Sequence, residues 1–184
     1  MKALLIFISI LFFNSCQKNN NEKSNLIEGD FNGDGITETA KLIKLDKESK
    51  DFKYYYEIIF SNKEIKKINI SSQSDVYGIN NENDLNNDNS DELSIIFNDR
   101  LENNCVNTMF IRKFENGKWS FLIDPITISL ECGKFKLDIQ DYVIKENDHI
   151  KFFSYESNLT TDKSGKIDNA SLQEKIIRLK QVLF

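Results

Sequence analysis

Short runs of alternating apolar and polar residues recur along most of the chain beyond residue 26. Residues 52–60 are aromatic and β-branched, isoleucines punctuate residues 65–70, and the apolar runs at 106–114 and 118–123 flank an Asn-Gly pair. A period of two is typical of half-buried strands, and Asn-Gly between apolar runs is typical of a tight hairpin. The pattern therefore predicts a mainly β fold, built as an antiparallel meander.

The last third of the chain continues the meander and then changes period. Residues 135–139 and 150–155 alternate as strands do, whereas Leu172, Ile176, Leu179 and Leu183 recur at helical spacing. Asn169 or Ser171 is a suitable residue to cap such a helix. We therefore expect a C-terminal helix over residues 171–184, packed on the sheet.

Two aspartate-rich loops, loop 1 (residues 30–38) and loop 2 (residues 84–92), each lead into a predicted strand. Calcium takes roughly six to eight oxygen ligands, and alternate positions of a tight loop can supply them. Each loop has side-chain oxygens at its first, third, fifth and ninth positions, and a backbone carbonyl at its seventh. The candidate calcium ligands are Asp30, Asn32, Asp34, Ile36 and Glu38 in loop 1, and Asp84, Asn86, Asp88, Ser90 and Glu92 in loop 2.

These loops begin like an EF-hand but do not end like one. The twelfth position holds Lys41 or Ile95 instead of glutamate, and strand-like runs follow at once. The sequence here resembles the FG-GAP/VCBS-type repeat, the calcium hairpin of integrin-like β-propeller blades, over about residues 30–100. The resemblance implies structural calcium and a role in binding at a surface. Asp30 and Asp84 are 54 residues apart, about one blade with its connection. Because two copies cannot close a propeller, we expect propeller-blade-like units that do not form a closed propeller.

The two loops differ at the turn. Loop 2 has Asn87 and Asn89 where loop 1 has Gly33 and Gly35, which predicts weaker calcium binding or a vestigial site in loop 2. The alternative for both loops is a set of metal-free Asx turns in an asparagine-rich chain.

The first fifteen residues have the pattern of an export signal. One lysine precedes an apolar segment at residues 3–13, which is shorter than the roughly 20 residues that span a bilayer. Ser15-Cys16 resembles the lipobox of bacterial lipoproteins, which implies cleavage before Cys16 and its lipidation. The expected organisation is a signal peptide (1–15), a lipidated flexible tether (16–25) and a single mainly β domain (26–184). An ordinary secretory peptide or a buried apolar segment is the alternative.

Composition and charge limit the classes of partner and of metal site that this protein can have. Hydrophobic residues make up 40% and charged residues 29%, with 24 basic against 29 acidic side chains and a net charge of −5. An acidic chain without a basic block argues against nucleic-acid binding. A single histidine, His149, excludes a histidine-rich metal site. Cys105 and Cys132 form an even pair beyond the lipidation site and predict a disulfide in an exported protein. On a reducing side of the membrane they would be buried thiols.

Aromatic residues are expected mainly in the core. Trp119 and Phe121 share one predicted strand face with Ile123 and read as core residues, while the consecutive tyrosines at 54–56 place at least one ring on the surface.

Together these features favour a lipid-anchored protein of the bacterial cell envelope, exported to the outer membrane or facing the periplasm. Its calcium-stabilised domain would be a non-enzymatic binding module that contacts the membrane through its lipid and recognises an unknown protein or glycan. One alternative is an envelope inhibitor or immunity-type lipoprotein. A less favoured one is a carboxylate-dependent hydrolase that uses Asp138, Asp141 and Glu146.

Overall fold

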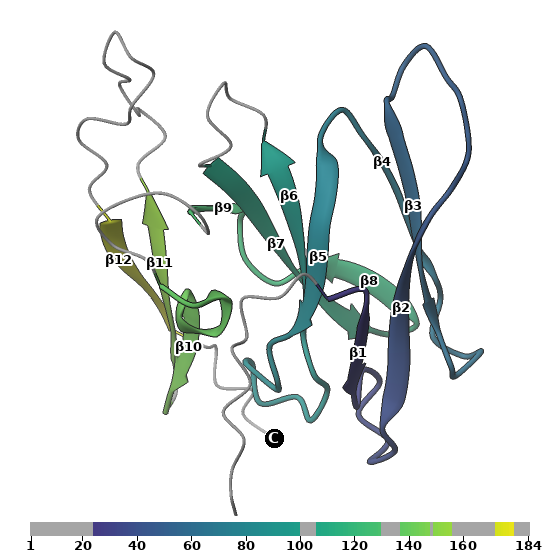
Figure 1. Ribbon diagram of the computed structural model, residues 1–184. Coiled ribbons are helices and arrows are strands. Elements are labelled where there is room, and N and C mark those ends of the chain that lie inside the picture. The colour runs from purple at the N-terminus through teal and green to yellow at the C-terminus, as the bar shows by residue number, and fades with distance from the viewer. Residues whose placement is uncertain (1–23, 100–105, 130–136, 148, 156–171, 179–184) are drawn as a thin grey trace, which may run out of the picture.

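The computed structural model describes residues 24–99, 106–129, 137–147, 149–155 and 172–178, and its strands form three antiparallel sheets that lie as successive layers (Figure 1). The first sheet is a meander in chain order. Its strands are β1 (Leu26–Gly29), β2 (Glu38–Lys44), β3 (Tyr54–Phe60) and β4 (Ile68–Ser72).

The middle sheet repeats this meander and adds one strand. It runs through β5 (Asp75–Asn81), β6 (Leu93–Asp99), β7 (Val106–Glu115) and β8 (Lys118–Phe121), and β9 (Ile126–Ile128) pairs with β7. The third sheet follows a short 3-10 helix, η1 (Ile139–Asp141), and contains β10 (Val143–Glu146), β11 (His149–Tyr155) and β12 (Leu172–Arg178). None of these sheets closes into a barrel or a propeller, so the expected mainly β, open architecture is confirmed.

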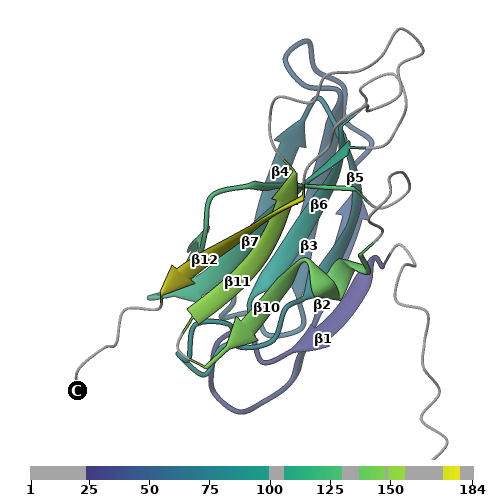
Figure 2. The same ribbon diagram turned by 90° about the vertical axis from the view of Figure 1, so that its left-hand side faces the viewer.

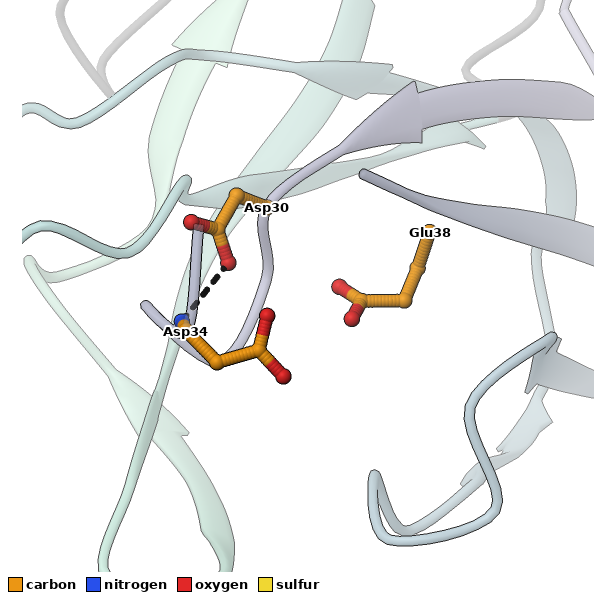
Figure 3. A group of neighbouring side chains, drawn as sticks. All are labelled: Asp30, Asp34 and Glu38. Carbon is orange, nitrogen blue, oxygen red and sulfur yellow. Dashed lines mark hydrogen bonds between the residues drawn. The ribbon is translucent and has the colours of Figure 1, made fainter. Parts of the chain in front are cut away.

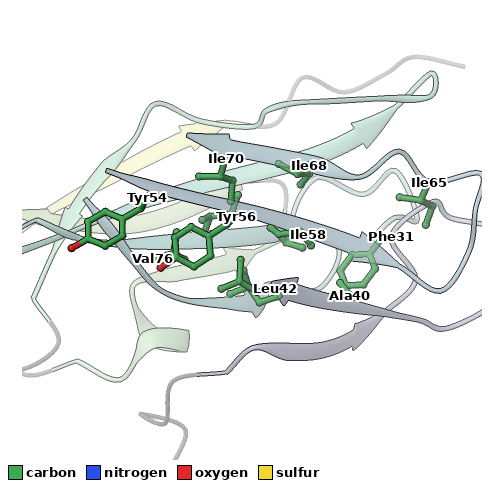
Figure 4. Close-up of a cluster of buried hydrophobic side chains, with 13 residues drawn as sticks. Phe31, Ala40, Leu42, Tyr54, Tyr56, Ile58, Ile65, Ile68, Ile70 and Val76 are labelled. Carbon is green, nitrogen blue, oxygen red and sulfur yellow. The ribbon is translucent and has the colours of Figure 1, made fainter. Parts of the chain in front are cut away.

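Strand β6 of the middle sheet is buried on both faces, which explains the nearly continuous apolar run at residues 93–97. Leu93 and Ile95 of β6 pack against the first sheet, whereas Ile96 points to the opposite face. Figure 4 shows the core between the first and middle sheets, where Leu42 and Ile58 meet the middle sheet's inner face. Alternation along a strand thus supplies both cores from one segment.

The third sheet lies over one face of the middle sheet (Figure 2), and the second core fills the space between them. Met109 and Ile111 of β7 pack there with Ile150 of β11, and all three are at most 1% exposed. Tyr142, fully buried after η1, donates its hydroxyl to the Ser129 carbonyl at 2.6 Å. This bond satisfies the phenol inside an apolar core.

The predicted Asn-Gly hairpin is confirmed. Asn116 (φ 52°) and Gly117 (φ 72°) both adopt the left-handed conformation between β7 and β8. Two positive φ angles match the twist of the flanking strands, as in a two-residue hairpin turn.

The predicted C-terminal helix is wrong over its described part, because Leu172–Arg178 form the strand β12. β12 pairs antiparallel with β11 over its whole length, from Tyr155↔Leu172 to His149↔Arg178. A spacing of four residues fits a strand of period two as well as a helix, so Leu172 and Ile176 did not discriminate. Pairing with the edge of β11 that β10 does not cover satisfies backbone N–H and C=O groups of both strands, and this favours the strand over the helix.

Other expectations fall partly or wholly outside the described residues. Of the strand expected at 135–139, residues 137–139 are described, and Ile139 belongs to η1 rather than to a strand. The signal peptide, Cys16, Cys105 and Cys132 lie outside the described residues, so the lipid anchor and the disulfide stay predictions. No described helix has the length and apolar character needed to cross a bilayer.

Candidate functional site

Loop 1 joins β1 to β2 and is organised around the carboxylate of Asp30. One oxygen, Oδ1, accepts the backbone N–H groups of Gly33 (2.8 Å) and Asp34 (3.1 Å), and Oδ2 accepts that of Gly35 (2.8 Å). The two glycines have φ angles of 75° and 81°, which let the chain fold tightly around the carboxylate.

Loop 2 joins β5 to β6 and has the same backbone arrangement. Asp84 Oδ1 accepts the N–H groups of Asn87 (2.7 Å) and Asp88 (3.2 Å), and Oδ2 accepts that of Asn89 (3.2 Å). Asn87 and Asn89 have φ angles of 65° and 70°. Asparagine tolerates this conformation better than most residues, so the missing glycines leave the loop geometry intact.

The ninth position anchors each loop to the core. Glu38 Oε2 accepts the N–H of Phe31 at 3.0 Å, and Glu92 Oε2 accepts that of Leu85 at 2.7 Å. Both glutamates are nearly inaccessible, 2% and 0% exposed. Phe31 belongs to the first core and Leu85 to the second, so each loop rests on a different side of the middle sheet.

Three carboxylates converge in loop 1. Asp30, Asp34 and Glu38 each place an oxygen within 4.8 Å of the others (Figure 3). Within the described parts of the chain, no other group of three metal-ligating side chains meets this distance. Asn32 donates to Asp34 Oδ2 at 2.9 Å, and the side chain of Ile36 is 66% exposed beside the site. A cluster of hard oxygen donors is the kind of site that suits Ca²⁺.

In loop 2, an amide of the loop itself donates hydrogen bonds to two of the three carboxylates. Asn86 Nδ2 donates to Asp88 Oδ2 at 2.9 Å and to Glu92 Oε1 at 2.7 Å. Burial raises the pKa of Glu92 to about 8, and the charges of Asp88 and Asp84 act in the same direction. Ser90, the proposed carbonyl donor, is buried and donates its N–H to Asp88 Oδ1 at 2.9 Å. Loop 1 has the same two contacts to its fifth-position aspartate, so the loops differ at the ninth-position glutamate.

The two loops touch through Asp91, which the sequence alone did not single out. The Asp91 N–H donates to the Asp30 carbonyl at 2.7 Å, and Asp91 Oδ2 accepts the Asp30 N–H at 3.0 Å. Asn81 Nδ2 donates to the same Oδ2 (2.9 Å) and to the Glu28 carbonyl (2.8 Å). The contact is so close that a Cβ on Gly29 would lie 2.4 Å from Asn81 Nδ2. No sequence signal identifies these partners, because they lie far apart along the chain.

A cluster of aromatic rings on the middle sheet is partly open to solvent. We call Phe97, Phe110 and Phe121 the aromatic surface. Phe110 lies 5.2 Å from Phe97 and 5.8 Å from Phe121 by ring centroids, and Phe121 is 52% exposed. The Arg112 guanidinium lies 4.1 Å from the Phe121 ring centroid. A shallow groove of about 240 Å³ adjoins it, lined by Ser71, Ser72, Ser74, Phe97, Thr108 and Phe110.

Two predictions about aromatic residues are wrong, one for the strand that contains Trp119 and one for the three consecutive tyrosines. Trp119 does pack in the core, stacked on Phe60 at 5.2 Å, but Phe121 is exposed and Ile123 joins the opposite core, since β8 ends at Phe121. The tyrosines at 54–56 are all buried, with at most 9% exposure. Tyr55 faces outward, but Phe52 and Lys47 cover its ring.

The carboxylates of the hydrolase alternative are held by separate elements. Asp138 and Asp141 lie at the two ends of η1, whereas Glu146 ends β10 and pairs with His149 (3.5 Å) and Lys151 (3.7 Å).

Comparison of the chain with protein-family models, with curated proteins and with solved structures finds no match.

Proposed function

We propose that the protein is an exported, lipid-anchored protein of the cell envelope whose β domain is a binding module stabilised by calcium in loop 1. The observation that carries the calcium assignment is the convergence of Asp30, Asp34 and Glu38 within 4.8 Å. Three carboxylates this close repel one another, and a divalent cation among them reverses the sign of that interaction.

Each loop 1 residue has a defined part in this proposal. Asp30, Asp34 and Glu38 are the carboxylate ligands, Asn32 adds its amide oxygen, and Ile36 adds its backbone carbonyl. Calcium suits an irregular set of this kind because its coordination is flexible, whereas Mg²⁺ demands near-octahedral geometry. The ion would join the end of β1 to the start of β2 and so support the contact with Asp91.

The binding role draws on two features. The FG-GAP/VCBS resemblance implies a surface binding module, and the aromatic surface offers partly exposed rings beside a hydroxyl-lined groove. Aromatic faces pack well against apolar side chains and against the C–H faces of sugars, so the ligand is a protein or a glycan. The membrane contact is assigned to the lipidated Cys16.

Calcium should raise the thermal stability of the mature protein. If loop 1 binds in the range of about 0.1–1 mM that is common for extracellular modules, then roughly 5 mM Ca²⁺ adds about 1–2 kcal/mol. Differential scanning calorimetry should show a melting temperature about 3–6 °C higher in calcium than in chelator. Mg²⁺ at the same concentration should do less.

Asp34→Ala should abolish most of this shift. The matched control is Asp124→Ala, an exposed aspartate outside both loops, which should keep it. Identical melting of the unsubstituted protein in calcium and in chelator, with no heat of calcium binding, would leave loop 1 as a set of metal-free Asx turns.

A further inference from the structure

A lysine side chain from elsewhere in the chain places a positive charge beside loop 2. The Lys145 ammonium group, on β10 of the third sheet, lies 3.9 Å from Asp84 Oδ2 and donates a hydrogen bond to the Asp84 backbone carbonyl. Asp84 holds the first position of loop 2, equivalent to Asp30 in loop 1. No ion pair described in the structure reaches Asp30, Asp34 or Glu38. The two loops thus differ in their electrostatic partners.

The backbone does not account for this difference. The first residue of each loop accepts the same set of N–H groups, and the left-handed residues have φ angles that agree within 11° (75° and 81° against 65° and 70°). The difference lies in what the neighbouring sheet presents. Loop 2 itself brings an acid, Asp91, to loop 1, whereas the third sheet brings Lys145 to loop 2.

A second contrast concerns the other two carboxylates. The Asn86 amide links Asp88 and Glu92 in loop 2, whereas the equivalent Asn32 amide reaches Asp34 (2.9 Å) and Glu38 Oε1 is reached only loosely, by Asn62 at 3.3 Å. The two loops therefore differ at one carboxylate oxygen, which the loop's own asparagine holds at 2.7 Å in loop 2 and a residue outside the loop holds at 3.3 Å in loop 1.

We propose that the Lys145 ammonium group is the resident cation of loop 2, in the role that a divalent ion has in loop 1. The contrast with loop 1 rests on the proposed calcium function, but the contact of Lys145 with Asp84 does not. The ammonium group lies 3.9 Å from Asp84 Oδ2, a proposed ligand atom. A divalent ion bound roughly 5 Å from that charge would be repelled even in water, by an amount equal to about tenfold in affinity. Lys145 thus links the third sheet to the middle sheet and excludes calcium from loop 2.

Calcium stoichiometry, measured calorimetrically on the mature protein, tests this inference. The unsubstituted protein should bind one ion, and Lys145→Met should bind a second, with an affinity for loop 2 at least about tenfold higher than before. Lys145→Arg keeps the charge and should bind one. In an Asp34→Asn background, which disables loop 1, Lys145→Met should retain a single site that Asp88→Asn removes.

The outcomes separate this inference from the proposed function. No ion in the unsubstituted protein but one in Lys145→Met would refute calcium in loop 1 and support the role of Lys145. A folded Asp34→Asn/Lys145→Met protein that binds no calcium would overturn the inference. So would two ions in the unsubstituted protein, one of them lost in Asp88→Asn, a result that needs no lysine variant. If Lys145→Met does not fold, Lys145→Gln retains a donor for the Asp84 carbonyl and carries the same test.

Discussion

At Asn87 and Asn89, asparagine serves in loop 2 as glycine serves in loop 1. All four positions have positive φ, and Asp84 accepts the same pattern of N–H groups as Asp30. The short polar side chain of asparagine offsets the steric cost of the left-handed conformation. The missing glycines therefore give no geometric reason for weaker calcium binding in loop 2, and the proposed reason is the Lys145 ammonium group.

Glu92 should make stability depend on pH. Its pKa is about 8 in the folded protein because it is buried, against an ordinary value of 4.5. The folded state therefore holds a proton that the unfolded chain releases above about pH 4.5. The resulting stabilisation is complete below that pH, declines as pH rises, and is lost above about pH 8, with a slope of at most about 1.4 kcal/mol per pH unit.

Urea unfolding between about pH 5 and pH 8 in chelator measures this slope. Glu92→Gln should show a flatter profile than the unsubstituted protein, and the exposed Glu64→Gln should match the unsubstituted protein. Burial also raises the pKa of Glu82, which adds a slope common to all three proteins. Parallel profiles for Glu92→Gln and the unsubstituted protein would show that Glu92 is ionised in the fold.

At the scale of elements, the junction of β1 with loop 2 joins the first sheet to the middle sheet. Asp91→Ala should lower the free energy of unfolding by about 1–3 kcal/mol, because the Asp30 N–H loses its acceptor and the Asn81 amide keeps only the Glu28 carbonyl. Asp91→Asn retains a side-chain oxygen and should cost less. Chemical denaturation at one pH in chelator measures both, and equal losses would mean that the Asp91 carboxylate charge, rather than its acceptor geometry, matters.

The conformation of β12 is determined by the strand beside it. Its residues fit a helix by spacing, yet pairing with β11 gives the backbone of Leu172–Arg178 a complete partner. An isolated amphipathic helix of this length is marginal in water, so an available sheet edge outweighs local preference.

At the scale of the molecule, the stacked sheets place loops 1 and 2 side by side at one end (Figure 1). The proposed lipid anchor would attach this stack to a membrane through the tether that precedes Leu26. In bacteria fed a clickable fatty acid, the protein should be labelled, because lipoprotein processing acylates the cysteine of the lipobox. Cys16→Ser should abolish the label and release the protein from the membrane fraction.

Cys105→Ser is the matched control for labelling and should retain it. A label that persists in Cys16→Ser would contradict the lipoprotein assignment and favour an ordinary secretory peptide.

Local spacing by itself determined the mainly β class, the positions of β2, β3, β6, β7 and β11, the β7–β8 turn and the two aspartate loops. These features depend on residues within about ten positions of one another, so alternation and turn chemistry suffice to predict them. The candidate ligands of loop 1 were visible for the same reason, since one short segment contains them all.

Only the tertiary structure decided which of the two loops gathers three carboxylates within 4.8 Å of one another. Lys145 is 61 residues from Asp84 in sequence, and Asp91 is 61 residues from Asp30. The burial of Tyr55, the exposure of Phe121 and the strand at β12 likewise depend on what packs alongside. Sequence spacing specifies how a segment folds on itself, but the charge and burial of a side chain depend on neighbours that stacking of the sheets brings together.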